Sequence, residues 1–224
     1  MKQTIPSDSS DFVIVLEHLK IIGGRFEYQD LQTTQARSHS IFSSSDMAFR
    51  DIRADIGKLS YAGDLSFDAR HISFRESCGF TTDSLNFSIG LKSHLLTLRD
   101  LNWHTPFSEI HIPAFRFMLP ISASRSARET SREEQYMLIA ASKINGRDPA
   151  FFTEYLRGNT ADLFLSASAY KFRDRYVFDF FNLSSSAFRF TAGGTVSDDF
   201  QSDKFSASVR INRLYADKSA AQEL

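Results

Sequence analysis

Residues 85–92 read Leu-Asn-Phe-Ser-Ile-Gly-Leu-Lys, with an apolar side chain at every odd position. Strict alternation places one set of side chains on one face of a β-strand and the other set on the opposite face. The same period of two recurs at residues 65–69, 110–112, 187–191 and 205–212. Ser, Asn, Arg and Asp in the second set indicate a face in water, which is typical of antiparallel sheets with one apolar face. The pattern predicts an all-β protein.

Turn signals divide the chain at short intervals. They are Gly23-Gly24, Ser43-Ser44-Ser45-Asp46, Ala62-Gly63-Asp64, Ser77-Cys78-Gly79, Arg99-Asp100, Thr105-Pro106 and Gly193-Gly194. Strands separated by turn signals every ~8–12 residues predict roughly a dozen strands. Because long loops are scarce, we expect a meander in which each strand pairs with the next.

Two stretches interrupt the alternation. Residues 122–135 contain no large apolar side chain, and their charges fit a solvated polar loop or, alternatively, a contact patch for an anionic head group or a partner. Residues 148–158 begin with Asp148 and Pro149 and end with Gly158, which predicts a short capped helix near 149–157. Phe152, Tyr155 and Leu156 would form its packing face.

These interruptions define the expected organisation of the chain. Residues 1–11 are predicted to be a flexible lead and residues 217–224 a tail. Two β-rich segments, 12–121 and 136–216, lie on either side of the polar loop 122–135, and the short helix belongs to the second segment.

Composition and charge exclude several classes of protein. The chain has 224 residues and a formal net charge of -1, which gives no electrostatic case for binding nucleic acid. A single cysteine excludes an internal disulfide. The longest apolar run, residues 12–16, is far shorter than the ~18 residues that span a bilayer, and the first residues lack the apolar core of a signal peptide.

No arrangement typical of catalysis or cofactor binding is present in the sequence. The six histidines are scattered without the spacing of a zinc site. Cys78 lies in a turn of mixed charge, and neither a Gly-x-Ser-x-Gly motif nor a glycine-rich phosphate loop occurs. Asp198-Asp199 is best interpreted as a polar turn. We therefore predict a protein that is not an enzyme and that uses no metal and no cofactor.

The apolar face remains the only candidate for a function. The chain has 22 Phe, and such residues on one face of a curved, open sheet would line a trough suited to acyl chains. A closed sandwich would instead bury the same face against a second sheet. Alternation alone leaves both arrangements open.

Several short sequence segments resemble TamB/AsmA-like proteins of Bacteroidetes-type bacteria. They cover about residues 20–195 and occur in the same order as in that family. Residues 22–30 and 49–52 are similar to the opening strands of that family's repeat, and residues 76–80 are similar to its Ser-Gly-Phe turn with Cys78 inserted. Residues 101–110 resemble its Leu-x-Leu-x-Thr-x-x-Ser-x-Ile phrase, with Trp103 in place of the second Leu. The family's repeat continues with a helix, which the segment beginning Asp148-Pro149 resembles. Residues 188–194 resemble the strand that enters the next repeat.

The resemblance implies a long, curved antiparallel sheet that forms an open, U-shaped apolar groove. Such proteins are anchored in the inner membrane, cross the periplasm towards an Omp85-type outer-membrane barrel, and are thought to move phospholipids or support outer-membrane assembly. Because the anchor helix and the C-terminal partner-binding part are not matched, we expect an internal piece of such a protein, located in the periplasm.

The lipid-groove hypothesis predicts which side chains contact phospholipid acyl chains. The alternative hypothesis is a structural or adhesive all-β module, without enzymatic activity, whose phenylalanines form a sealed core. The predicted groove-lining residues are Phe67, Leu85, Phe87, Ile89, Leu91, Leu98, Trp103, Ile112, Phe117, Phe188 and Phe190.

Overall fold

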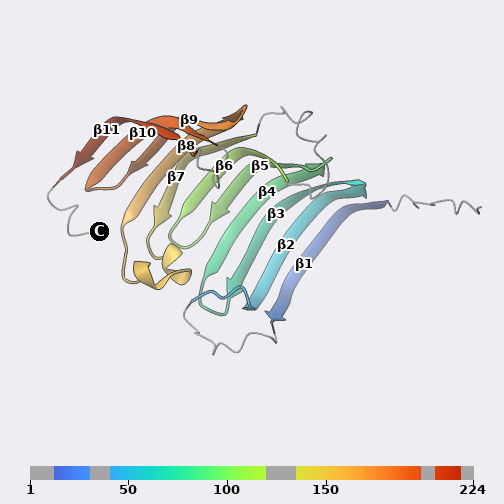
Figure 1. Cartoon of the computed structure of the whole chain (residues 1–224). Coiled ribbons are helices and arrows are strands. Elements are labelled where there is room, and N and C mark those ends of the chain that lie inside the picture. The colour runs from blue at the N-terminus through green and yellow to red at the C-terminus, as the bar shows by residue number, and fades with distance from the viewer. Residues whose placement is uncertain (1–12, 31–40, 120–134, 198–204, 218–224) are drawn as a thin grey trace, which may run out of the picture.

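A computed structural model describes residues 13–30, 41–119, 135–197 and 205–217, which form one open sheet of eleven antiparallel strands (Figure 1). Each strand pairs with the next one along the chain, so the predicted all-β meander is confirmed. The strands are β1 (Ile14–Gln29), β2 (Asp46–Ala62), β3 (Asp64–Glu76), β4 (Thr81–Lys92), β5 (Leu95–His104), β6 (Glu109–Met118), β7 (Tyr136–Asn145), β8 (Asp162–Phe172), β9 (Arg175–Ser184), β10 (Phe188–Ser197) and β11 (Ala207–Ala216).

The sheet continues across the predicted boundary between the two β-rich segments, because β6 pairs with β7 through Phe115 and Met137. The predicted polar loop 122–135 lies outside the described residues except for Gln135. The predicted lead 1–11 and, beyond Asp217, the predicted tail 217–224 also lie outside them, as does Asp198-Asp199.

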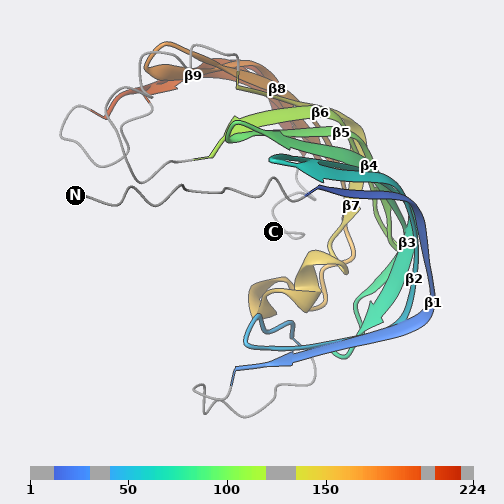
Figure 2. The same cartoon turned by 90° about the vertical axis from the view of Figure 1, so that its right-hand side faces the viewer.

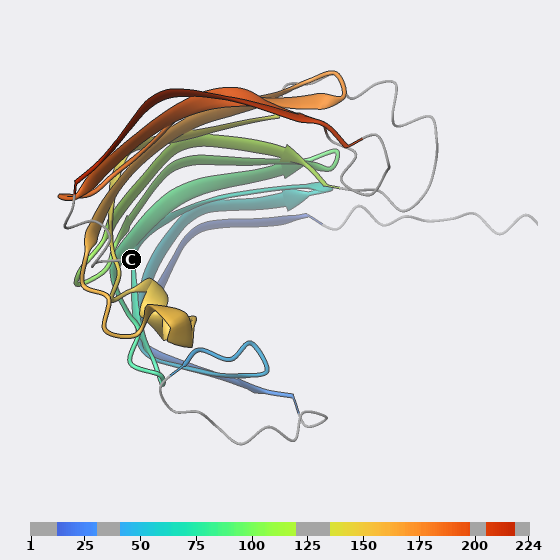
Figure 3. The same cartoon turned by 60° about the vertical axis from the view of Figure 1, so that its left-hand side comes forward.

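The sheet curves around a concave side, and strands such as β1, β2 and β3 bend along their length (Figures 2 and 3). The bend coincides with register shifts that interrupt most of the strand pairs. Five residues at these shifts have positive φ, namely Gly23 (68°), Asp51 (55°), Lys58 (54°), His71 (51°) and Asp100 (52°). A β-bulge adds a residue to one strand and bends it. Apart from the one at Lys58, the shifts occupy neighbouring positions from strand to strand and form one row, here called the fold line.

Polar side chains along the fold line compensate for backbone groups that the shifts release. Asn86 Oδ1 accepts a hydrogen bond from the His71 amide at 2.7 Å. Ser142 Oγ accepts one from the His111 amide at 2.9 Å. These side chains therefore give the two amides a partner where the strand pairing is interrupted, which makes the bend compatible with folding.

Three predicted turns are wrong. Gly23-Gly24, Arg99-Asp100 and Gly193-Gly194 lie inside β1, β5 and β10, at the fold line. The residue types that permit a turn also permit a bulge, and at Gly193 a Cβ would lie 3.0 Å from the Asp179 carbonyl oxygen. The predicted turns around Gly63 and Cys78 and at Thr105-Pro106 are confirmed as connections between strands.

The predicted capped helix is also wrong. Residues 149–157 form two 3₁₀ turns, Pro149–Phe151 and Glu154–Leu156. The Asp148 side chain does not cap the first turn and instead binds hydroxyl groups of the β5–β6 connection. Tyr155, predicted to pack, is 98% exposed.

The buried apolar core is small. Among the described residues, most buried apolar side chains are alanines, and Phe80 and Leu95 are the two large ones. Phe80, 5% exposed, is the only buried phenylalanine among those described. A sealed sandwich would bury many large side chains, so the remaining phenylalanines lie on a surface that is only partly covered.

Candidate functional site

One face of the sheet carries an apolar row from strand to strand. Cross-strand partners in a sheet point to the same face. Phe67 of β3 pairs with Ile89 of β4, which pairs with Leu98 of β5, which pairs with Phe115 of β6. In the C-terminal strands, Phe190 of β10 pairs with two other apolar residues, Leu183 of β9 and Leu214 of β11. We call this apolar side the inner face.

The fold line divides the inner face into two arms, and both contain predicted groove-lining residues. Register places all eleven of them on the inner face, and each is half-buried. The open arm contains Phe67, Phe87, Ile89, Leu91, Leu98 and Phe117, and the loop arm contains Leu85, Trp103, Ile112, Phe188 and Phe190. Their contact with lipid remains a prediction.

The open arm has no second layer among the described residues. Its ring contacts join neighbouring positions, with centroids 5.9 Å apart for Phe67 and Phe87 and 6.1 Å apart for Phe115 and Phe117. Extensive contact between described strands occurs only between neighbours in the sheet. The apolar side chains of this arm are therefore packed laterally and remain accessible from the concave side.

The outer face is polar along much of its length. Its cross-strand pairs include Asp68 with Ser88 and Asn102 with His111. Exposed apolar side chains occur there too, such as Phe164, which pairs with Ser184. The contrast between the two faces matches the prediction from alternation in β4.

The loop arm is partly covered by the segment between β7 and β8. We call residues 146–161 the inner loop, and Figures 2 and 3 show it on the concave side of the sheet. The rings of Phe151 and Phe152 lie 5.8 and 5.1 Å from Phe80, whose ring lies 5.9 Å from Trp103. The Trp103 indole donates a hydrogen bond to Thr82 Oγ1 at 3.1 Å, which satisfies its polar atom.

Sequence reasoning missed Phe80 and Phe151 as members of this cluster. Phe80 follows a turn rather than an alternating strand, and Phe151 was expected in a helix with a different packing face. The Asp-Pro start of the inner loop was a visible signal for a compact turn, but it did not indicate which part of the sheet the loop would meet.

Glu76 stabilises the turn below Phe80. The carboxylate, 2% exposed, accepts hydrogen bonds from the Ala48 amide at 3.1 Å and the Ser77 hydroxyl at 2.9 Å. Burial alone would raise its pKa. Hydrogen bonds from Cys78, Ala48 and Ser77 outweigh burial and hold the pKa of this carboxyl below its usual value.

Cys78, in the same turn, is a poor candidate for a nucleophile. Burial raises the pKa of its thiol to about 11, and the hydrogen bond to Glu76 acts in the same direction. The thiolate is the reactive form, so this cysteine is protonated near neutral pH. The role predicted for it, a small side chain in a turn, fits this environment.

The described residues offer neither a metal site nor a membrane-spanning helix. Across residues 13–30, 41–119, 135–197 and 205–217, no three His, Cys, Asp or Glu side chains gather as metal ligands would. In the same ranges no helix has the length and apolar character needed to cross a membrane. Comparison of the chain with protein-family models, curated proteins and solved structures found no match. The apolar row on the inner face, which is uncovered by described residues on the open arm, makes this face the candidate site.

Proposed function

We propose that the inner face is a lipid groove that conducts or shields phospholipid acyl chains. The observation that carries the proposal is the open arm, where Phe67, Phe87, Ile89 and Leu98 form a continuous apolar surface that is half-buried and has no described layer above it. Contiguous exposed apolar surface of this kind marks a site for an apolar ligand, a membrane or a partner.

The chemistry of the face suits acyl chains. Each methylene moved from water into an apolar environment contributes about 0.8 kcal/mol, so one acyl chain needs few polar contacts. The face carries hydrocarbon and aromatic side chains, whereas polar residues such as Asp68 and Ser88 lie on the outer face. A phospholipid head group would remain at the opening of the concave side, in water.

The resemblance to TamB/AsmA-like proteins extends the proposal to a cellular setting. In that setting the chain is a segment of a longer, periplasm-spanning protein anchored in the inner membrane. Its groove carries phospholipid towards the outer membrane and supports outer-membrane assembly, and the parent protein contacts an Omp85-type barrel. The support for this setting from the structure is the curved, open antiparallel sheet, which agrees with the fold that the resemblance implies.

The test is native mass spectrometry with lipid extraction on the purified chain. The protein would be expressed in a bacterial host, washed free of detergent, and incubated with vesicles of phosphatidylethanolamine and phosphatidylglycerol. We expect bound phospholipid on the wild-type chain and its loss in Phe87→Asp. Because Phe87 is half-buried, this variant should keep its fold, which circular dichroism would check.

Thr97→Asp is the matched control. Thr97 is also half-buried, but it lies on the outer face between Gly90 and Arg116, so a carboxylate is tolerated there. Lipid retention in this variant, with loss in Phe87→Asp, supports the groove. A lipid-free wild-type chain, together with unfolding of Phe87→Asp, would favour the structural or adhesive module instead.

A further inference from the structure

We infer that the inner loop, residues 146–161, is a stopper that excludes acyl chains from the loop arm and confines them to the open arm. The inference rests on the proposed function and adds a boundary to the same site. It follows from three features of the loop: the position of its rings, the closure of its two ends, and a buried polar attachment to the sheet.

The rings occupy the place that an acyl chain would take on the loop arm. Phe151 and Phe152 pack on Phe80, which in turn covers Trp103. On the other side, the Phe42 amide donates to the Phe151 carbonyl at 2.7 Å, and the rings of Phe42 and Phe152 lie 5.3 Å apart. The loop therefore joins segments that are distant in sequence into one local core.

The approach of the loop to the sheet depends on a glycine. A Cβ on Gly79, which has φ of 100°, would lie 3.3 Å from the Phe151 ring. Positive φ and this close approach both favour glycine at the β3–β4 turn. The turn is therefore shaped to accept the Phe151 ring.

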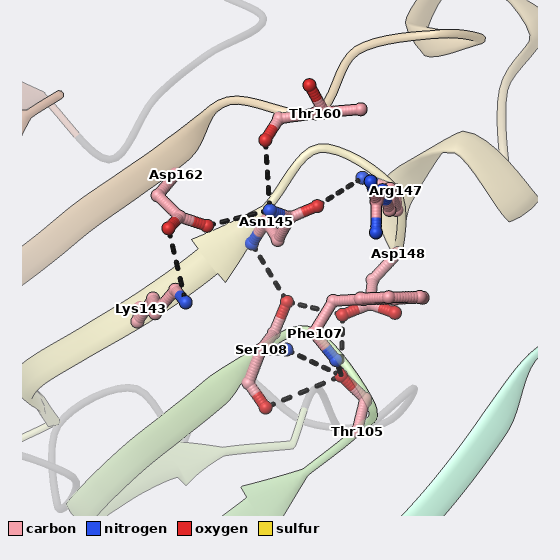
Figure 4. A network of polar contacts seen from close by, with 9 residues as sticks. All are labelled: Thr105, Phe107, Ser108, Lys143, Asn145, Arg147, Asp148, Thr160 and Asp162. Carbon is pink, nitrogen blue, oxygen red and sulfur yellow. Dashed lines mark hydrogen bonds and ion pairs between the residues drawn. The ribbon is translucent and has the colours of Figure 1, made fainter. Parts of the chain in front are cut away.

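The two ends of the inner loop are held together at its base. The Gly146 amide donates to the Ala161 carbonyl at 3.0 Å. Asn145 Nδ2 donates to Asp162 Oδ1 at 2.7 Å and to the Thr160 carbonyl at 3.0 Å (Figure 4). A Cβ on Gly146 would lie 2.6 Å from Asn159 Oδ1, so only glycine fits. The loop is thus a closed unit, with a base that can be joined by a shorter connection.

A buried carboxylate attaches the loop to the β5–β6 connection. Asp148, 7% exposed, accepts hydrogen bonds from the hydroxyls of Thr105 and Ser108 (Figure 4). The same Ser108 hydroxyl accepts one from the Asn145 amide at 2.9 Å, and Thr105 Oγ1 accepts one from the Ser108 amide at 2.8 Å. Charge-assisted hydrogen bonds in a buried setting are strong and geometrically specific. The attachment fixes the Phe151 and Phe152 rings over the loop arm.

The position of the chain's single tryptophan makes the inference testable. Trp103 lies on the loop arm beneath Phe80, whereas Phe87 lies on the open arm. Phospholipids with brominated acyl chains quench an indole only on close contact. We expect little quenching of Trp103 in the wild-type chain when such lipids bind, and severalfold stronger quenching of an indole placed on the open arm by Phe87→Trp in a Trp103→Phe background.

Removing the stopper should expose Trp103 to lipid. Residues 147–160 would be replaced by an Asn-Gly turn, which suits a two-residue connection between Gly146 and Ala161. Quenching of Trp103 should then rise to the level of the open-arm indole. If the shortened chain fails to fold, Asp148→Asn is the variant to use. It weakens the attachment of the inner loop and should also raise quenching of Trp103. Tyr155→Ser is the matched control, because Tyr155 is 98% exposed on the same loop.

The outcomes separate the two proposals. Absence of quenching at the open-arm indole would overturn the lipid groove and the stopper with it. Strong quenching at that indole together with equally strong quenching of Trp103 in the wild-type chain would overturn the stopper and leave the groove standing. Unchanged Trp103 quenching in both loop variants would also overturn the stopper.

Discussion

The two arms of the inner face contain the same kinds of residue and differ in what lies above them. On the loop arm, Phe80 is 5% exposed because the inner loop packs against it. On the open arm, Phe87 is half-buried and its nearest ring neighbour, Phe67, lies beside it in the same sheet. Composition therefore does not decide whether an apolar side chain of this face is buried. What decides it is whether another segment of the chain, here the inner loop, packs on that side chain.

The difference in coverage also suggests that the loop arm contributes to stability and the open arm to ligand binding. The loop arm combines aromatic packing with hydrogen bonds accepted by the buried carboxylates of Asp148 and Glu76, and such an arrangement stabilises a single conformation. The open arm has lateral packing alone, which leaves apolar surface for a ligand. We expect stability to depend mainly on the first arm and lipid binding mainly on the second.

The largest expected difference between the arms is in stability. Phe80→Ala removes a buried ring and should lower the free energy of unfolding by about 3–5 kcal/mol. Phe87→Ala removes a half-buried ring and should cost about half as much. Urea denaturation of both variants would measure this, and Phe80→Leu would serve if Phe80→Ala does not fold. Equal losses at the two positions would contradict the division between the arms.

A smaller effect is expected at the attachment of the inner loop. Asp148→Ala leaves the hydroxyls of Thr105 and Ser108 without their shared acceptor and should cost about 1.5–3 kcal/mol. Glu154→Ala is the comparison, because its ion pair with Arg157, at 3.8 Å on the same loop, lies in water and should change stability little. Thermal unfolding of the two variants would show whether the buried carboxylate is the one that matters.

Local alternation was sufficient to predict the sheet and the inner face of the open arm. β4 contains no positive-φ residue, so Leu85, Phe87 and Ile89 keep one parity, and the face could be predicted from spacing alone. Register was harder to predict. At Arg99-Asp100 and Gly193-Gly194 the residues that permit a turn instead permit a bulge, and only the pairing of both neighbouring strands decides between them.

The loop arm depends on contacts that local sequence does not specify. Asp148 and Pro149 have the pattern of a helix start, yet the carboxylate is engaged by Thr105 and Ser108 from a distant connection. The segment forms two 3₁₀ turns, and the second of them is capped by Thr153. The burial of Phe80 likewise depends on Phe151, which no spacing rule links to it.

The turn at Glu76 adds an acid-sensitive contribution on the loop arm. The pKa of the Glu76 carboxyl is lower in the folded chain than its usual value of 4.5. The stabilisation from Glu76 is therefore fully present above pH 4.5 and is lost as the pH falls through the lower pKa of the folded chain. The wild-type chain should therefore lose stability in this acidic range, and Glu76→Gln should flatten that part of the profile. Urea midpoints measured from neutral pH into this range would test it; identical profiles for the two chains would show that Glu76 contributes nothing to acid sensitivity.

The smallest effect concerns reactivity rather than stability, and it compares the arms directly. A rise in the Cys78 pKa from 9.0 to about 11 lowers the thiolate fraction by about 100-fold at mildly alkaline pH, so a thiol-specific reagent should label it slowly. Glu76→Gln should speed labelling, because the hydrogen bond and the nearby negative charge both raise that pKa. In a Cys78→Ser background, Ile89→Cys places a thiol on the open arm, where no carboxylate accepts its proton, and labelling should be faster there. Added phospholipid should then slow labelling at position 89 and leave Cys78 in the wild-type chain unaffected, since the ligand is expected on the open arm alone.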